Sequence, residues 1–222
     1  MKVAIMQPYF FPHFAYFQLI SAVDFYVNLD HVSFMKRSYM VRNRIKNNTS
    51  INISVKNASQ NKKCTEVFIE SSCHYIDKFK KTIKFLYGKH KNFELIFNTI
   101  IEPNFNSSEK TISQFNIEII KSICDFLDIK TNIINSSEGI TTEKREDGLI
   151  DIVKKYNGLT YINAIGGIDL YDKQYFKNKG IDLFFLKTNV NSFVDKNISI
   201  LDLLFEYDKE FIVNEIDNYE LI

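Results

Sequence analysis

The sequence uses several residue types sparingly. Among its 222 residues are seven glycines, three prolines and three cysteines, and tryptophan is absent. With so few glycines, the chain contains neither the G-x-G-x-x-G loop nor the G-x-x-x-x-G-K loop that cradles phosphates. The cysteines are odd in number, and neither they nor the four histidines have metal-ligand spacing. We therefore expect free thiols, as in cytosolic proteins, and no metal site.

Long apolar runs and a strong net charge are also missing. No segment approaches the roughly 20 apolar residues that a membrane-spanning helix needs. The apolar start of the chain is interrupted by Gln7, Pro8 and Pro12, unlike a secretory signal. A net charge of +1 gives no general reason to expect a nucleic acid or a membrane as partner. The sequence predicts a cytoplasmic protein.

The apolar residues that are present follow an alternation of strands and helices. Residues 3–6 form a continuous apolar run, residues 14–22 have helical spacing, and residues 25–29 form a second apolar run. This order predicts a βαβ unit with a right-handed parallel crossover. The alternation resumes later, with strands expected at 130–134, 160–163 and 181–187 and helices at 146–156 and 170–178.

The middle of the chain has a different pattern. Helices are expected at 75–87, 93–101 and about 109–127, the second of them ending at Pro103. Residues 31–48 lack periodicity and are interpreted as a functional loop, and 51–55 and 64–69 as two strands that could form a hairpin. Helical pieces are expected at 199–205 and 209–214. The prediction is one α/β domain over 1–222, a Rossmann-like parallel sheet with a helical insertion at about 75–127.

The strongest candidate for a site is the segment between the first strand and the first helix. In open α/β sheets, ligands bind beyond the carboxyl ends of the strands. A helix amino terminus there favours phosphate or carboxylate, and His13 could donate a hydrogen bond or act as an acid or base. The alternative is an aromatic loop that packs on the sheet, with His13 as a surface residue.

Two acidic residues bracket the second strand. Asp30 follows it, near the same crevice, where it could accept from a sugar hydroxyl or an amine or bind a metal, although Asp also favours strand-ending turns. Asp24 precedes it and has the same turn interpretation. Gly166 and Gly167 follow a later strand and either let the backbone approach a ligand or form a plain turn. Ser136 and Ser137 follow another strand and could line the crevice, although a helix cap is the simpler interpretation.

Arginine is the scarce cation of this chain. Only four residues are arginine, and Arg37, Arg42 and Arg44 fall within eight positions. A guanidinium offers a rigid fork for phosphate or carboxylate that lysine cannot copy. We therefore expect Arg42, with Asn43 as a hydrogen-bonding neighbour, to clamp an acidic group such as a nucleotide diphosphate. The alternative is a solvated basic face.

Two known families resemble parts of this sequence. The stretch from Gln7 to Phe17, with Asp24, Asp30 and Arg42–Asn43, resembles the WbqC-like family, and so does the segment from Tyr161 through Gly166–Gly167 and Tyr171 to Ile181. The chain departs from the family at Ala15, where Gly is usual, and His13 occupies a variable position. A weaker resemblance links Pro12 to Tyr16 with the H-x-G-H opening of nucleotidyltransferases, with Tyr16 replacing the second histidine.

The WbqC-like resemblance implies a step in bacterial surface-polysaccharide biosynthesis, such as O-antigen or lipopolysaccharide. The implied activity attaches an amino acid such as glycine, or another acyl group, to the amine of a nucleotide-linked amino sugar. Catalysis would fall to His13, Tyr16 and Asp30. Substrate binding would fall to Gln7, Pro8, Tyr9, Asp24, Arg42, Asn43, Gly166, Gly167 and Tyr171.

Other functions stay open from the sequence. One alternative is an ATP- or CTP-dependent nucleotidyltransferase or an adenylate-forming ligase, and another is a non-catalytic binding subunit of the pathway. The expected partner is a small-molecule nucleotide sugar, with a nucleotide or acyl donor as co-substrate. An aminoacyl-tRNA donor and a homodimer also stay open.

Overall fold

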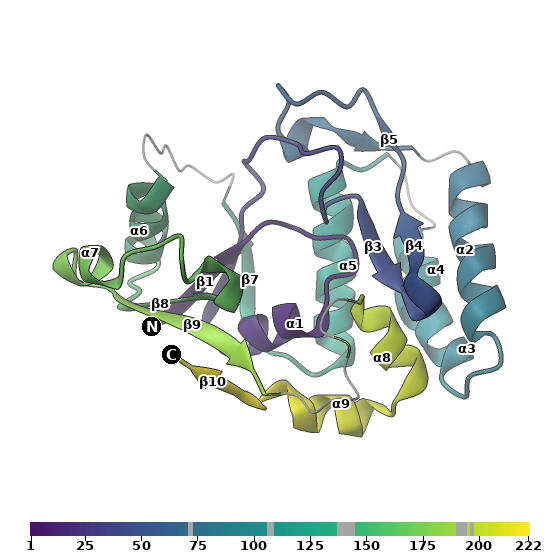
Figure 1. Cartoon of the computed structure of the whole chain (residues 1–222). Helices are drawn as coiled ribbons and strands as arrows, with labels where there is room; N and C mark the ends of the chain where they lie inside the picture. Colours follow the sequence, from purple (N-terminus) through teal and green to yellow (C-terminus); the bar gives the residue numbers. More distant parts are fainter. Residues whose placement is uncertain (71–72, 106–108, 137–144, 190–194, 196–197) are drawn as a thin grey trace.

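The computed structural model describes residues 1–70, 73–105, 109–136, 145–189, 195 and 198–222. At its centre is a six-stranded sheet in the order β10-β9-β8-β1-β2-β7 (Figure 1). The strands are β1 (Lys2–Met6), β2 (Phe25–Asn28), β7 (Asn132–Asn135), β8 (Thr160–Ala164), β9 (Asp182–Thr188) and β10 (Tyr219–Leu221). All neighbours are parallel except β10, which is antiparallel to β9. The predicted α/β class with a mostly parallel sheet is confirmed.

Helices cover both faces of this sheet (Figure 1). Ala4 of β1 packs in one apolar cluster with α1 (Phe14–Ser21), whereas Val3 and Ile5 pack in a second cluster with α6 (Arg145–Lys155) and α7 (Lys173–Asn178). This split follows from the period of two along a strand. The chain moves from β1 to β2 on one side and returns to place β8 on the other, so a topological switch point lies between β1 and β8.

The long connection from β2 to β7 contains two small hairpins. β3 (Arg42–Ile45) pairs with β4 (Thr49–Asn52), and β5 (Val55–Lys56) pairs with β6 (Phe68–Ile69). The prediction of a loop over 31–48 is therefore wrong at its end. Periodicity missed β3 because its two arginines conceal an alternation that buries only Asn43 and Ile45.

Helices fill the rest of this connection, as predicted. They are α2 (Cys73–Tyr87), α3 (Phe93–Ile96), a π-helical turn at Phe97–Ile101, α4 (Glu102–Phe105) and α5 (Ile112–Phe126). The prediction that a helix ends at Pro103 is wrong, since the helical run from Phe93 passes through it to Phe105. Pro103 is the second residue of α4, directly after the π-helical turn, where the regular i→i−4 hydrogen bonding is already interrupted.

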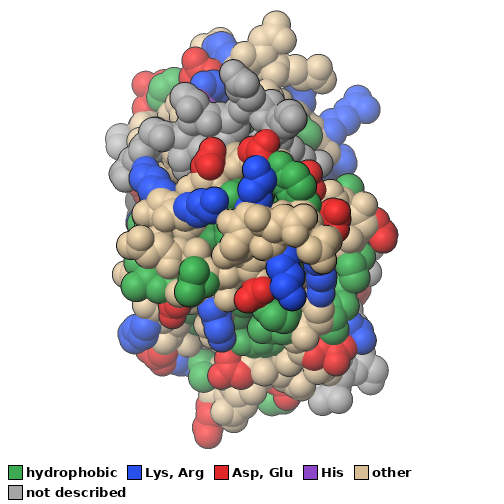
Figure 2. All heavy atoms as spheres, turned by 90° about the vertical axis from the view of Figure 1, so that its left-hand side faces the viewer, with side chains coloured by type: hydrophobic (Ala, Val, Ile, Leu, Met, Phe, Trp, Pro, Cys, Tyr) green, Lys and Arg blue, Asp and Glu red, His purple; other side chains and the backbone are tan. Residues whose placement is uncertain are grey.

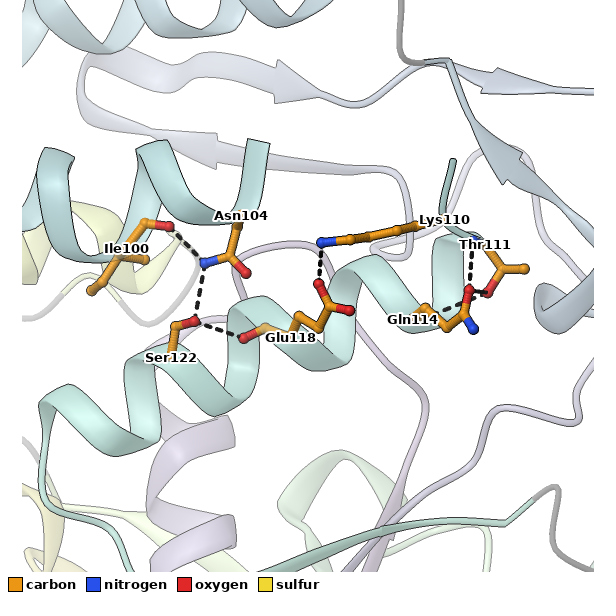
Figure 3. A network of polar contacts seen from close by, with 7 residues as sticks. All are labelled: Ile100, Asn104, Lys110, Thr111, Gln114, Glu118 and Ser122. Atoms are coloured by element: carbon orange, nitrogen blue, oxygen red, sulfur yellow. Dashed lines mark hydrogen bonds and ion pairs between the residues drawn. The ribbon is translucent and has the colours of Figure 1, made fainter. Parts of the chain in front are cut away.

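A polar network fixes the start of α5 and joins it to the preceding helices (Figure 3). Thr111 caps α5, accepting from the Gln114 N–H at 3.2 Å, while the Gln114 side chain accepts from the Thr111 N–H at 3.0 Å. Further along, the buried Asn104 donates to the Ile100 carbonyl at 2.6 Å and to the Ser122 hydroxyl at 3.0 Å. The cap places the start of α5 three residues after the predicted one.

The end of the chain closes the sheet edge next to β9. α8 (Ile200–Glu206) and α9 (Lys209–Ile216) match the predicted helical pieces, whereas β10 was not predicted. The Gln18 amide of α1 donates to the carbonyls of Glu215 and Asn218, each at 3.1 Å, and so ties α1 to the segment before β10.

The outer surface on the α6 and α7 side carries mixed charges. Figure 2 shows basic and acidic side chains interspersed over this face, in keeping with a net charge of +1. No helix among the described residues is long and apolar enough to cross a membrane.

Candidate functional site

A cavity of about 880 Å³ lies at the carboxyl ends of the central strands. Met6 of β1, Ala164 of β8 and Thr188 of β9 line it, and so does the first turn of α1. It therefore occupies the switch point, where α/β proteins bind ligands. Eight residues predicted from the sequence to form the site line this cavity: Gln7, Tyr9, His13, Tyr16, Asn43, Gly166, Gly167 and Tyr171.

Two buried asparagines hold the loop between β1 and α1. Asn116 of α5 donates to the Pro8 carbonyl at 3.0 Å and to the Met40 carbonyl at 2.8 Å. Asn43 of β3 donates to the Phe11 carbonyl at 2.7 Å, and its own oxygen accepts from the next backbone N–H at 2.8 Å. Each amide satisfies buried backbone groups that would otherwise be costly to desolvate.

The aromatic side chains of the loop anchor it in the core. Phe10 and Phe11 are fully buried, and the ring of Phe11 stacks on Phe79 at 5.8 Å between centroids. Phe11 has a φ of 42°, a strained conformation for a bulky residue, which the hydroxyl of Ser199 stabilises by donating to its carbonyl at 2.8 Å. The loop is thus held rigid by packing and hydrogen bonds in addition to its prolines.

His13 combines burial with an unsatisfied polar atom. It precedes α1 in an extended conformation and lines the cavity. Its Nδ1 is buried and has no hydrogen-bond partner among the described residues. Burial lowers the pKa of His13 below its usual 6.5. The imidazole is therefore neutral near pH 7 and carries one lone pair and one N–H, as a general base requires.

Tyr16 has a different role from the one its position suggests. Its hydroxyl accepts from Tyr26 and donates to the Gln7 carbonyl at 2.7 Å. Burial raises the pKa of Tyr16 far above 10. Because its proton is already engaged and its pKa is raised, this geometry favours a role for Tyr16 in positioning Gln7 over one in proton transfer.

Asp30 lies directly behind the cavity wall. It is buried after β2 and accepts from the Ser136 hydroxyl at 2.9 Å, and Ser136 itself lines the cavity. Asp30 can therefore affect a ligand through Ser136. The neighbouring prediction for Ser137 lies outside the described residues.

Besides Asp30, three predicted residues are not among those that line the cavity. Asp24 lies just before β2, at the amino ends of the parallel strands, whereas the cavity lies at their carboxyl ends. It is exposed there and accepts from the Lys2 N–H at 2.8 Å. The side chain of Arg42 is exposed on β3. Pro8 is buried and contributes its carbonyl to the contact with Asn116. The structure thus does not bring the expected arginine clamp to the cavity.

The two glycines after β8 differ in what they allow. They belong to a 3₁₀ turn, Ile165–Gly167. A Cβ on Gly167 would lie 2.6 Å from the Asn163 amide nitrogen and 3.3 Å from the Tyr171 ring, whereas one on Gly166 would meet nothing within 4 Å. Close packing therefore requires a glycine at 167, and position 166 is open.

Several lining residues were not predicted as members of the site. Ser136 follows β7, Asn163 is the last residue but one of β8, and Thr188 ends β9, so a polar residue near the end of an apolar run was the available signal. Met35 and Tyr39 line the mouth from the segment before β3, and no signal in the sequence pointed to them.

The described part of the cavity wall contains no Lys, Arg, Asp or Glu residue. The described residues contain no group of three or more His, Cys, Asp or Glu side chains placed to hold a metal ion. The wall combines apolar side chains with a few amides and hydroxyls, an arrangement typical of small-molecule sites.

Comparisons with known proteins cover almost the whole chain. The model of the WbqC-like protein family matches residues 7–213. "Uncharacterized protein Rv1507c" of Mycobacterium tuberculosis (strain ATCC 25618 / H37Rv) is 23% identical over 223 residues, which cover 94% of this chain and 95% of the relative. No solved structure matches the chain.

Proposed function

The chain belongs to the WbqC-like protein family, and from this premise we propose that it acylates a nucleotide-linked amino sugar in bacterial surface-polysaccharide synthesis. An acyl or aminoacyl group is transferred to the sugar amine. The observation that carries the proposal is His13, a neutral and partly unsatisfied base on the wall of the cavity at the switch point.

The reaction needs a base because only a free amine attacks a carbonyl carbon. The amine nitrogen forms an amide bond with the acyl carbon of an activated donor, and the bond from that carbon to the leaving group breaks. His13 takes the proton from the attacking nitrogen and returns it to the leaving group, which departs with the electron pair. The partial positive charge at the start of α1, beside His13, stabilises the oxyanion that develops on the carbonyl oxygen.

The rest of the cavity wall carries groups that can bind the acceptor, the nucleotide-linked amino sugar. Ser136, Asn163 and Thr188 supply hydrogen-bonding groups for sugar hydroxyls at the strand ends. Tyr9 and Tyr39, with ring centroids 5.5 Å apart, offer an aromatic face for the nucleobase, and Tyr39 is half exposed at the mouth. The phosphates then face solvent at the mouth, because the described wall carries no cationic clamp.

The test replaces His13 with glutamine, which keeps hydrogen-bonding capacity but cannot accept a proton. Acyl transfer to UDP- and dTDP-linked amino sugars should fall about 10²- to 10⁴-fold, while the Kd of the nucleotide sugar changes less than about twofold. The acid limb of the wild-type rate should lie below pH 6.5, because burial lowers the His13 pKa. His74→Gln, at an exposed position on α2, is the matched control.

Two results would contradict the proposal. One is full transfer activity in His13→Gln, and the other is failure of every nucleotide-linked amino sugar to bind.

A second candidate is nucleotidyl transfer. It is favoured by the position of His13 directly after the β1 loop at the start of α1, where a histidine can contact phosphate oxygens. Release of pyrophosphate from ATP or CTP in the presence of a candidate acid would identify this activity.

A further inference from the structure

Two basic side chains meet at the mouth of the cavity. His31 lies three residues after the end of β2, lines the cavity and is exposed. The half-buried Lys63 places its ammonium against the Nε2 atom of His31. An ammonium carries only donors, so Nε2 accepts and the neutral ring holds its proton on Nδ1. The remaining N–H groups of both side chains have no partner among the described residues.

Backbone contacts hold the two segments that carry this pair. Ser33 forms an antiparallel bridge with Lys63. Beside it, the buried Cys64 donates twice to the Val32 carbonyl, from its N–H at 3.0 Å and from its thiol at 3.1 Å. The contact between the two side chains therefore rests on a fixed backbone, which lowers the entropy lost when a ligand binds them.

No carboxylate of the described residues neutralises Lys63, which forms no ion pair with any of them. The nearby Glu66 uses its carboxylate to accept from the Lys63 backbone N–H at 2.7 Å. Asp30, which precedes His31 in the chain, is buried and accepts from the Ser136 hydroxyl at 2.9 Å. The ammonium thus keeps its charge for an anion at the mouth.

The segment that forms the mouth adds further positive charge. A turn over residues 35–38 is closed by a 3.2 Å hydrogen bond between its first carbonyl and its last N–H. Lys36 and Arg37 occupy the tip of this turn and are exposed, and the residues on either side, Met35 and Tyr39, line the cavity. Local positive charge at the mouth of a cleft raises the concentration of an anionic ligand there.

We infer that His31 and Lys63 bind the diphosphate of a nucleotide-linked ligand at the mouth of the cavity. This inference rests on the proposed function and assigns the phosphate subsite of its acceptor. The Lys63 ammonium acts as a point charge for one phosphate oxygen, and the Nδ1–H of His31 donates to another. A nucleobase on the exposed ring of Tyr39 then stays at the entrance, while the sugar enters the cavity toward His13.

The experiment measures binding of the nucleotide part alone. UDP and dTDP are titrated calorimetrically into the full chain at about 50 mM and about 300 mM salt, and the wild-type Kd should rise with salt because the contact is accessible and therefore screened. Lys63→Met should raise the Kd at low salt about tenfold or more, as expected for a lost charge-assisted hydrogen bond, and should weaken the salt dependence.

Further variants separate the contact from a general effect of charge. Lys63→Arg keeps the charge and should bind within about threefold of the wild type. His31→Ala removes a neutral donor and should raise the Kd about three- to tenfold. Lys89→Met removes an equal charge at an exposed position that does not line the cavity, and should leave the Kd unchanged.

Two results would overturn the inference: neither diphosphate binds the wild type, or Lys63→Met and Lys89→Met bind with the same Kd. Failure of the proposed function alone looks different, since diphosphate binding would depend on Lys63 while no nucleotide-linked amino sugar is acylated. Failure of this inference alone would leave both acyl transfer and nucleotide binding unchanged in Lys63→Met.

Discussion

At the scale of single residues, neutral polar side chains organise the candidate site. Asn43, Asn116 and Ser199 come from three distant parts of the chain, yet all three donate to carbonyls of the loop after β1. An amide or hydroxyl can satisfy a buried carbonyl without the desolvation penalty of a charge. This explains how a loop with a strained residue keeps one conformation beside an open cavity.

Asp202 of α8 leads to a prediction about pH. It is buried, its Oδ1 accepts from the Lys46 N–H at 3.1 Å, and its Oδ2 has no partner among the described residues. Burial raises its pKa from 3.8 to about 6. A raised pKa in the folded state means that the folded protein binds the proton more tightly than the unfolded chain. The stabilisation is complete below pH 3.8 and is lost as the pH rises through about 6.

We expect Asp202→Asn to remove this loss. Between pH 4 and pH 7 the free energy of unfolding of the wild type should fall relative to the variant by on the order of 3 kcal/mol. Urea unfolding at unit pH intervals measures it, with the exposed Asp208→Asn as control. Parallel curves for wild type and Asp202→Asn would contradict the assignment.

At the scale of elements, β3 places its charged residues on one face and its uncharged residues on the other. Arg42 and Arg44 are exposed, while Asn43 and Ile45 are buried, as the alternation of a strand requires. The Arg44 guanidinium donates to the Asn48 side chain at 3.2 Å, outside the cavity. The strand thus presents its amide, and not its guanidinium groups, to the candidate site.

This alternation predicts opposite outcomes for neighbouring substitutions. Arg42→Ala should change the Kd of a nucleotide-linked amino sugar less than about twofold. Asn43→Ala should lower the free energy of unfolding by about 2 kcal/mol, because the carbonyls of Phe10 and Phe11 lose a buried donor, and should weaken ligand binding as the loop loosens. Calorimetric titration and urea unfolding measure the two effects. Loss of ligand binding in Arg42→Lys would instead support the arginine clamp that was predicted from the sequence.

The connection between β2 and β7 also supports the site. α5 supplies Asn116, and Phe79 of α2 stacks on Phe11. Neither Asn116 nor Phe79 is among the residues that line the cavity. The inserted helices therefore form the back support of the loop.

At the scale of the whole molecule, core packing protects the thiols. Cys64 and Cys124 are buried, and burial raises their pKa values to about 11 and about 12. Only the thiolate reacts with a disulfide reagent. In a Cys73→Ser variant, both thiols should therefore react with Ellman's reagent at pH 8 at least about 100-fold more slowly than in the urea-unfolded chain. The release of thionitrobenzoate measures the rate, and one fast thiol in the native protein would show that its burial is wrong.

Much of the fold was predictable because its signals are local. The apolar runs at β1 and β2 and the helical spacing of α1 predicted the βαβ unit, and Gly180, with a φ of 81°, follows α7 as expected of a helix end. β10 was not predictable, since three residues carry too little periodicity. It pairs with β9 only because α8 and α9 return the chain to that edge.

The part of the candidate site that could be predicted is the part whose residues directly follow a strand. Residues directly after β1 and β8 lie on the cavity because parallel strands end at one edge of the sheet. Asp24 and Arg42 do not line the cavity. Asp24 precedes its strand, β2, and Arg42 faces outward from β3, a strand that the sequence pattern did not reveal.

By itself, the sequence determined the class of the sheet, most of its elements and the loop where the site lies, because apolar periodicity reports the geometry of one segment at a time. Tertiary structure alone decided which carbonyls Asn116 and Ser199 satisfy, why His13 is neutral, and which residues line the cavity. Those properties depend on burial and on contacts between distant segments, and no local pattern of residues encodes them.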